Sequence, residues 1–187
     1  MKKSAVLGLI FLGFLTSCQI TEIDAKDPVT QRAEDIAQIN DYIQRKNLGT
    51  PDTTESGARY FIMEVGEGQQ IKSNDIVGLR YIASATSGHV YDTNISSVAD
   101  TSTLRYDTLE MIFTYTTTGW TSRYLYFVSD LSGPGLGEAI AAGLSQVTTE
   151  GHIKVILPSD QINFSNAFGP LPAKSLAIYD IFPKTIY

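Results

Sequence analysis

The stretch that decides the fold reads Val77-Gly-Leu-Arg-Tyr-Ile-Ala83, in which every second side chain, starting from the valine, is apolar. A period of two is typical of a strand that buries one face. Ser87-Gly88 then indicates a turn, and His89-Val-Tyr-Asp92 brings the chain back. The two segments are therefore expected to form neighbouring strands, with Tyr81 and Tyr91 close together.

Further apolar runs extend this pattern on both sides of the central hairpin. Strands are predicted at Tyr60–Val65, Ile153–Leu157 and Leu176–Ile181. A short helix is predicted before the second of these from the four-residue spacing of Leu136, Ile140 and Leu144. With 43% hydrophobic and 18% charged residues in 187 positions, the chain has enough apolar side chains for one globular domain with short additions.

The N-terminus resembles the signal of a bacterial lipoprotein. Two lysines precede an apolar run from Ala5 to Leu15, which is short for a bilayer span. Leu15-Thr-Ser-Cys18 follows and resembles a lipobox, so residues 1–18 are expected to be a signal with Cys18 as the lipidation site. The alternatives are an ordinary signal peptide with a chance cysteine and an N-terminal membrane helix. Gln19 favours lipid anchoring in the outer membrane of the cell envelope.

A tether and a helix are predicted over residues 19–56. Asp27-Pro28 resembles an N-cap followed by a first-turn proline, and three residues recur at helical spacing, namely Ile36, Ile39 and Ile43. The helix is expected to run from about 28 to 47. Its apolar stripe is expected to pack on the main domain in preference to a partner helix.

Charge and residue counts exclude several classes of function. Without the two lysines of the signal, 12 basic residues stand against 20 acidic ones, which disfavours a nucleic-acid partner. Two histidines and one cysteine are too few for a usual zinc site or a disulfide framework. Neither a metal nor another cofactor is expected.

Taken in order, these motifs are similar to those of FKBP-type peptidyl-prolyl cis-trans isomerases, in the divergent form of Bacteroidetes-like lipoproteins. The matching stretches are Thr54-x-Ser-Gly-x-x-Tyr60, Gly66-x-Gly68, Asp75-x-Val-x-x-x-Tyr81 and Gly88-x-x-Tyr-Asp92. The resemblance implies an α+β domain over residues 57–187, in which a twisted antiparallel sheet wraps a short helix. It also implies isomerisation of X-Pro bonds without a covalent step.

The resemblance further implies a pocket. Tyr91 stands where the family usually has phenylalanine, Ile140 where many members have a tryptophan beneath the prolyl ring, and Asn163 near a missing Ala-Tyr-Gly motif. By spacing from Ile140, Phe127 is the candidate for the pocket phenylalanine. Asp92 would be the polar contact that orients the twisted amide, and the walls would be Tyr81, Tyr91, Phe127, Ile140 and Tyr179.

Residues 93–133 form an insertion relative to a minimal domain of this family. Eight of the 19 aromatic residues lie between Tyr91 and Phe127, including Trp120. The runs Leu109–Tyr115 and Arg123–Val128 flank a turn-like segment and predict a β-hairpin. The hairpin is expected to cap a sheet edge, and the alternatives are a recognition flap or a separate aromatic surface.

Three functions follow as hypotheses. The leading one is a monomeric prolyl isomerase that acts on proline-containing envelope or exported polypeptides. The second is a non-catalytic chaperone or binding lipoprotein, because Ile140 and Asn163 depart from the family pattern. The third is a surface lipoprotein that binds glycans through Trp120 and neighbouring tyrosines.

Overall fold

The structure, a computed structural model, describes residues 27–98, 111–116, 119–122, 134–162 and 175–187. The helices are α1 (Pro28–Lys46), α3 (Pro134–Leu144) and the 3-10 turn η1 (Ser159–Gln161). The strands are β1 (Asp52–Thr53), β2 (Arg59–Glu64), β3 (Ile76–Ser84), β4 (Val90–Thr93), β5 (Met111–Thr116), β6 (Gly119–Ser122), β7 (His152–Leu157) and β8 (Ala177–Ile186). The predicted α+β class, an antiparallel sheet around a short helix, is confirmed.

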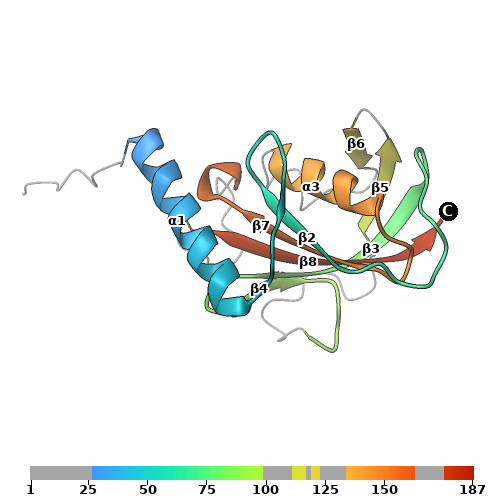
Figure 1. The fold of residues 1–187 in the computed structure, drawn as a ribbon. Coiled ribbons are helices and arrows are strands. Elements are labelled where there is room, and N and C mark those ends of the chain that lie inside the picture. Colours follow the sequence, from blue (N-terminus) through green and yellow to red (C-terminus); the bar gives the residue numbers. More distant parts are fainter. Residues whose placement is uncertain (1–26, 99–110, 117–118, 123–133, 163–174) are drawn as a thin grey trace, which may run out of the picture.

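The strands form one eight-stranded antiparallel sheet (Figure 1) in the order β1-β2-β7-β8-β3-β5-β6, with β4 also paired to β3. Strand β3 is the centre of this arrangement. One edge of β3 pairs with β8, and the other pairs first with β5 at Ile76–Leu79 and then with β4 at Ile82–Ser84. The predicted pairing of the two segments that carry Tyr81 and Tyr91 is therefore confirmed.

Helices α1 and α3 cover opposite faces of the sheet. Val155 and Tyr179 belong to the core cluster that also holds the buried residues of α3, whereas Ile156 and Ile178 pack with α1. Because successive side chains of a strand point to opposite faces, the two clusters lie on different sides of the sheet. Figure 1 shows α3 lying along the sheet and α1 standing at one end.

Helix α1 begins and ends where its sequence predicts. The Asp27 side chain accepts a hydrogen bond from the Thr30 backbone N–H at 3.1 Å, Pro28 occupies the first turn, and Asn47 ends the helix in the left-handed conformation. The predicted apolar stripe is wrong at one position, because Ile36 is 40% exposed and Asp35 is buried instead. None of the helices in the described part of the chain is long and apolar enough to span a bilayer.

Polar contacts explain why Asp35, and not Ile36, faces the domain. The Asp35 carboxylate accepts hydrogen bonds from the backbone N–H and the hydroxyl of Ser159 at 2.8 and 2.7 Å. Arg32, one turn earlier, donates to the Ser56 carbonyl and pairs with Asp160 of η1. These bonds, together with the burial of Ile39 and Tyr42, attach α1 to the domain at two separate places.

The insertion contains the predicted hairpin, with one correction. Strand β5 pairs antiparallel with β6, and Thr116 faces Gly119 across the pair. The second strand of the described hairpin therefore begins at Gly119, within the segment predicted as the turn, and the predicted run Arg123–Val128 lies outside the described residues. The side chain of Trp120 lies outside the described part of the structure.

Candidate functional site

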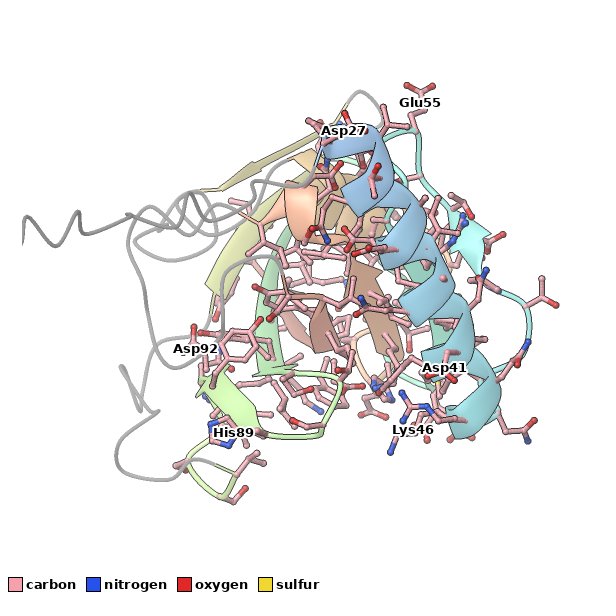
Figure 2. The ribbon with its side chains drawn as sticks, turned by 90° about the vertical axis from the view of Figure 1, so that its left-hand side faces the viewer. Asp27, Asp41, Lys46, Glu55, His89 and Asp92 are labelled. Atoms are coloured by element: carbon pink, nitrogen blue, oxygen red, sulfur yellow. The ribbon has the colours of Figure 1, made fainter. Side chains whose placement is uncertain are left out.

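The predicted polar contact of the site is a hydrogen bond between β3 and β4. The Tyr81 hydroxyl donates to Asp92 Oδ2 at 3.0 Å, and both side chains are buried. Figure 2 shows Asp92 well apart from α1, on which Asp41 and Lys46 are labelled. A buried phenol thus holds a buried carboxylate in one orientation, which is what a fixed polar contact in an apolar site requires.

A bulge in β4 brings two consecutive side chains into the same region. Ala83 faces Asp92 and Ser84 faces Val90, so Tyr91 is an extra residue in the pairing. Alternation along a regular strand would send neighbouring side chains to opposite faces. In this strand Tyr91 and Asp92 are both buried, with 5% and 2% of their surfaces exposed.

Three consecutive residues hold Tyr81 through three different atoms. Asp92 accepts from its hydroxyl, the Thr93 hydroxyl donates to its backbone carbonyl at 2.6 Å, and Asn94 Oδ1 accepts from its backbone N–H at 2.8 Å. The Asn94 side chain also donates to the Leu79 carbonyl at 3.0 Å. Its amide therefore bridges the part of β3 that lies between the pairing with β5 and the pairing with β4.

Tyr91 and Tyr179 complete the cluster. Burial, with a smaller contribution from the nearby Asp92, raises the pKa of Tyr179 to about 12, although the neighbouring Tyr91 hydroxyl opposes the shift. Burial, followed by the proximity of Tyr179, Asp92 and Tyr81, raises the pKa of Tyr91 well above its ordinary value. Both phenols are therefore neutral over the physiological pH range.

The Tyr91 hydroxyl is buried beside the hydroxyl of Tyr179. Their interaction raises the pKa of Tyr91 and opposes the rise in the pKa of Tyr179, which is the pattern of a hydrogen bond donated by Tyr91. Such an interaction offsets the free energy that is lost when a hydroxyl is removed from water.

The structure thus brings together five of the six predicted site residues. Tyr81, Tyr91, Ile140 and Tyr179 share one core cluster, and Asp92 is bonded to the first of them. Phe127, Asn163 and the lipidation site Cys18 lie outside the described residues. Thr93 and Asn94 were not predicted from the sequence, and their only signal is that two polar residues follow Asp92 directly, at the end of β4.

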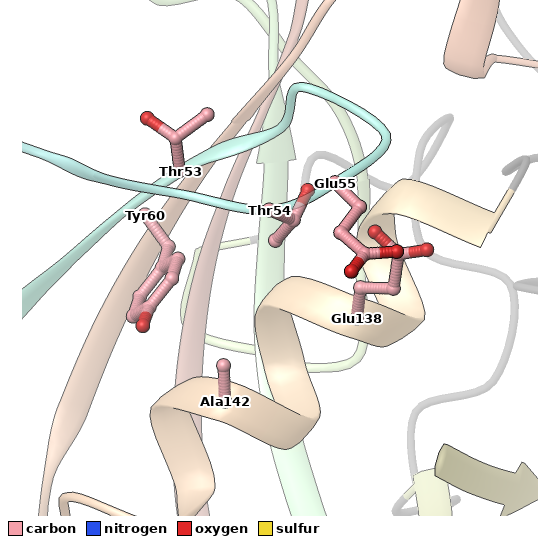
Figure 3. Close-up of a pocket in the computed structure, with 6 residues that line it drawn as sticks. All are labelled: Thr53, Thr54, Glu55, Tyr60, Glu138 and Ala142. Atoms are coloured by element: carbon pink, nitrogen blue, oxygen red, sulfur yellow. The ribbon is translucent and has the colours of Figure 1, made fainter. Parts of the chain in front are cut away.

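A separate cavity lies on the other side of α3 (Figure 3). Its volume is about 320 Å³, and it is lined by Thr53, Thr54, Glu55, Tyr60, Glu138 and Ala142. Glu138 accepts hydrogen bonds from the hydroxyl and the backbone N–H of Ser56, and the hydroxyl contact lowers its pKa. These bonds attach α3 to the turn before β2, so Glu138 has a structural role at the rim of the cavity.

The opposite face of the sheet carries a compact ionic cluster. Asp180 lies 2.7 Å from His152 and 2.6 Å from Lys154, and the His152 ring stacks on Phe182 with centroids 4.5 Å apart. Burial alone would raise the pKa of Asp180, but its contacts with His152 and Lys154 outweigh burial and lower it. Asp180 follows Tyr179 in β8 and therefore points away from the tyrosine cluster.

Comparisons with known proteins find similarity in structure but not in sequence. The sequence matches no family model and no curated protein. The structure is similar to FkpA from Escherichia coli, with a TM-score of 0.49 and 17% identity over 84% of this chain, which spans only 62% of FkpA. It is also similar to a peptidyl-prolyl cis-trans isomerase from Pseudomonas syringae pv. tomato, with a TM-score of 0.47 and 13% identity over 86% of this chain and 96% of that one.

A third similar structure is the N-terminal domain of FKBP42 from Arabidopsis thaliana. Its TM-score is 0.47, with 12% identity over 74% of this chain and 93% of that one. At these identities the similarity to FKBP-type structures is one of fold. The case for a function rests on the residues of the site.

Proposed function

We propose that the protein is an FKBP-like peptidyl-prolyl cis-trans isomerase. The observation that carries the proposal is the convergence of Tyr81 and Asp92, from one hairpin, with the distant Tyr179 on one buried cluster. These are the positions that the family motifs mark for the walls and the polar contact of a prolyl pocket.

The physical demands of the reaction match such a cluster. Rotation about an X-Pro bond crosses a barrier of about 18 to 20 kcal/mol that arises from amide resonance. The planar amide has more charge separation than the twisted one, so a dry aromatic wall disfavours the ground state relative to the transition state. Asp92, held by Tyr81, is proposed to orient the twisted amide, with no covalent step and no cofactor.

The test is cis-trans exchange of a proline-containing peptide, followed by NMR with the purified protein. We expect catalysed exchange, and we expect Asp92→Ala to slow it about tenfold, which corresponds to about 1.4 kcal/mol in the barrier. Asp41→Ala is the control, because Asp41 is an exposed residue of α1 that pairs only with Arg45 in the described contacts. Absence of any rate enhancement by the wild type would sink the proposal.

We also propose that the protein is lipid-anchored in the outer membrane through Cys18 and meets proline-containing polypeptides in the cell envelope. The support is the lipobox-like Leu15-Thr-Ser-Cys18 after a short apolar run. Mass spectrometry of the mature N-terminus is expected to find an acylated cysteine, and Cys18→Ala should move the protein out of the membrane fraction. An intact, unmodified Cys18 within the cellular protein would contradict the anchor.

A non-catalytic peptide-binding protein is the second candidate. It is favoured by Ile140, which is completely buried in the core at the position where many family members have a tryptophan. A smaller floor gives the prolyl ring less contact area, which weakens binding energy specific to the transition state. Binding of the test peptide without faster exchange would identify this function in place of the enzyme.

A further inference from the structure

Helix α1 exposes apolar side chains that do not pack on the domain. Val29 is 76% exposed, more than any other large apolar side chain in the described part of the chain, and Ile36 is 40% exposed. The two residues are seven positions apart, so they lie on the same side of the helix. Ala33 and Ala37, which are also exposed, lie on that side as well. These four residues are called the outer flank of α1.

The outer flank differs from the other two sides of the helix. The docked side holds Ile39 and Tyr42, which are buried in the cluster beneath α1. The third side is polar and exposed, with Gln38, Asp41 and Arg45. A surface helix usually confines its apolar residues to the side that faces the core. An apolar flank without a charge, next to the docked side, therefore indicates a second apolar neighbour.

The length of the chain before α1 indicates what this neighbour is. Nine residues, 19–27, separate the proposed lipidation site Cys18 from the first residue of the helix. Even a fully extended chain of this length reaches only about 35 Å. Val29 is the second residue of α1 and is therefore among the described residues that are held closest to the anchor. The outer flank stays within reach of the bilayer surface whenever the lipid is inserted.

A second copy of the chain is a poorer occupant of the outer flank. From Val29 to Ala37 the flank extends about 12 Å along the helix axis, and a helix is about 10 Å wide. The resulting area is on the order of 100 Å², whereas a stable protein interface needs about 800 Å² from each partner. A tethered helix needs only a weak contact with the bilayer, because the lipid anchor already holds it at a high effective concentration near the surface.

We propose that the outer flank of α1 lies against the lipid bilayer and orients the domain on the membrane. The inference rests on the proposed lipid anchor, and it goes further by naming the surface of the folded domain that contacts the lipid. Because the flank has no charge, the contact is apolar and does not require anionic lipid. It leaves the tyrosine cluster open to polypeptides, since that cluster lies on the other face of the sheet from α1.

The experiment measures how close each side of α1 lies to the bilayer. The mature lipidated protein is reconstituted in neutral phosphatidylcholine vesicles that contain a nitroxide-labelled lipid, which quenches fluorophores near it. Cys18 is the only cysteine of the chain and carries the proposed lipid, so a cysteine introduced elsewhere is the single free thiol for a fluorophore. We expect the label on Ile36→Cys to be quenched at least about twofold more strongly than the label on Gln38→Cys.

Gln38→Cys is the matched control. Gln38 is exposed and lies only about 3 Å further along the helix axis than Ile36, but on the polar side, so distance from the anchor does not separate the two labels. A third label, on Ala33→Cys, tests whether the apolar side chains make the contact. Replacing Val29 and Ile36 together by serine should reduce its quenching to the level of the control. Both side chains are exposed, so the melting temperature should stay unchanged.

The charge of the vesicle provides a further test. Adding anionic lipid, or raising the salt concentration, should leave the quenching of the Ile36→Cys label unchanged, because the outer flank carries no charged residue. Quenching that appears only with anionic lipid and disappears at high salt would overturn the inference. It would show that the basic residues of the helix, and not its outer flank, make the contact.

The remaining outcomes also decide the inference. Equal quenching of the Ile36→Cys and Gln38→Cys labels in a lipidated protein would overturn the inference and leave the anchor standing. Cross-linking of two chains through Ile36→Cys, without quenching by the labelled lipid, would overturn it and assign the outer flank to a second copy. A mature protein without lipid on Cys18 would overturn the anchor and the inference together, and mass spectrometry recognises this case before any labelling.

Discussion

Two buried carboxylates, Asp35 and Asp92, lie in different parts of the molecule and have different surroundings. Asp35, on α1, accepts from the backbone and the hydroxyl of Ser159 and from the Gln31 side chain at 2.9 Å. Asp92, on β4, accepts from the Tyr81 phenol and lies near the Tyr91 and Tyr179 phenols. The first carboxylate is held by donors from α1 and η1, and the second lies in a cluster of phenols that come from three strands.

This difference separates stability from binding. At the α1 junction the hydrogen bonds join elements that are distant in the sequence, so their loss should weaken the fold. In the tyrosine cluster the Tyr81–Asp92 hydrogen bond joins neighbouring strands of one hairpin and lies in the proposed site, so its loss should weaken the binding of a ligand more than the fold. The largest effect on stability is therefore expected at the junction, although it lies outside the proposed site.

Asp35→Ala should have that largest effect. The change leaves the Ser159 N–H and two side-chain donors without their acceptor, and we expect the free energy of unfolding to fall by about 4 kcal/mol. Chemical denaturation measures it. Asp41→Ala, on the same helix but exposed, should change stability by less than about 0.5 kcal/mol. Equal small effects of the two changes would show that α1 is not held by Asp35.

The helix illustrates what the sequence makes predictable. Its ends were predicted correctly, because the Asp-Pro start and the Asn-Leu-Gly end are local signals. Its buried face was predicted correctly at Ile39 and wrongly at Ile36, because periodicity assigns isoleucine to the inside and aspartate to the outside. Only the tertiary position of Ser159, more than a hundred residues away, makes Asp35 the better residue for the interior.

In the site, too, some features were predictable from sequence patterns and others depend on tertiary structure. The alternation of Val77, Leu79 and Tyr81 predicts β3, and the family order predicts Asp92 and Tyr179 as its neighbours. The β4 bulge was not predictable, because one extra residue in a short strand leaves no periodic trace. The bonds from Thr93 and Asn94 to the Tyr81 backbone were missed for a related reason, since no sequence pattern shows that Tyr81 lies between the part of β3 that pairs with β5 and the part that pairs with β4.

Alkaline pH should lower the stability of the fold through the tyrosine cluster. The pKa of Tyr179 is about 12 in the folded protein and about 10 when unfolded. Below pH 10 both states keep the proton. Between about pH 10 and 12 the unfolded state loses it and the folded state does not, so stability falls by about 2 to 3 kcal/mol.

The titration has a direct control. Ultraviolet absorbance of phenolate follows the ionisation, and denaturation at each pH gives the stability. Tyr179→Phe should lose less stability over the same range. Tyr42 beneath α1 also has a raised pKa, caused first by burial, and contributes equally to both proteins. Identical pH profiles for the parent and the variant would mean that Tyr179 ionises freely in the folded state.

Asn94→Leu should have the smallest effect on stability of the three, and it tests whether the division between stability and binding is complete. Leucine has the same branched heavy-atom skeleton as asparagine but neither donates to the Leu79 carbonyl nor accepts from the Tyr81 N–H. We expect a loss of about 2 kcal/mol in the free energy of unfolding. Because Tyr81 then shifts relative to Asp92, peptide affinity should fall as well, unlike in Asp35→Ala.

The control for Asn94→Leu is the replacement of the exposed Ser96 by alanine, two residues further along, which should change neither stability nor peptide affinity. A variant that loses stability but keeps full peptide affinity would mean that Asn94 supports the sheet alone, and that the Tyr81–Asp92 contact is positioned by the bulge.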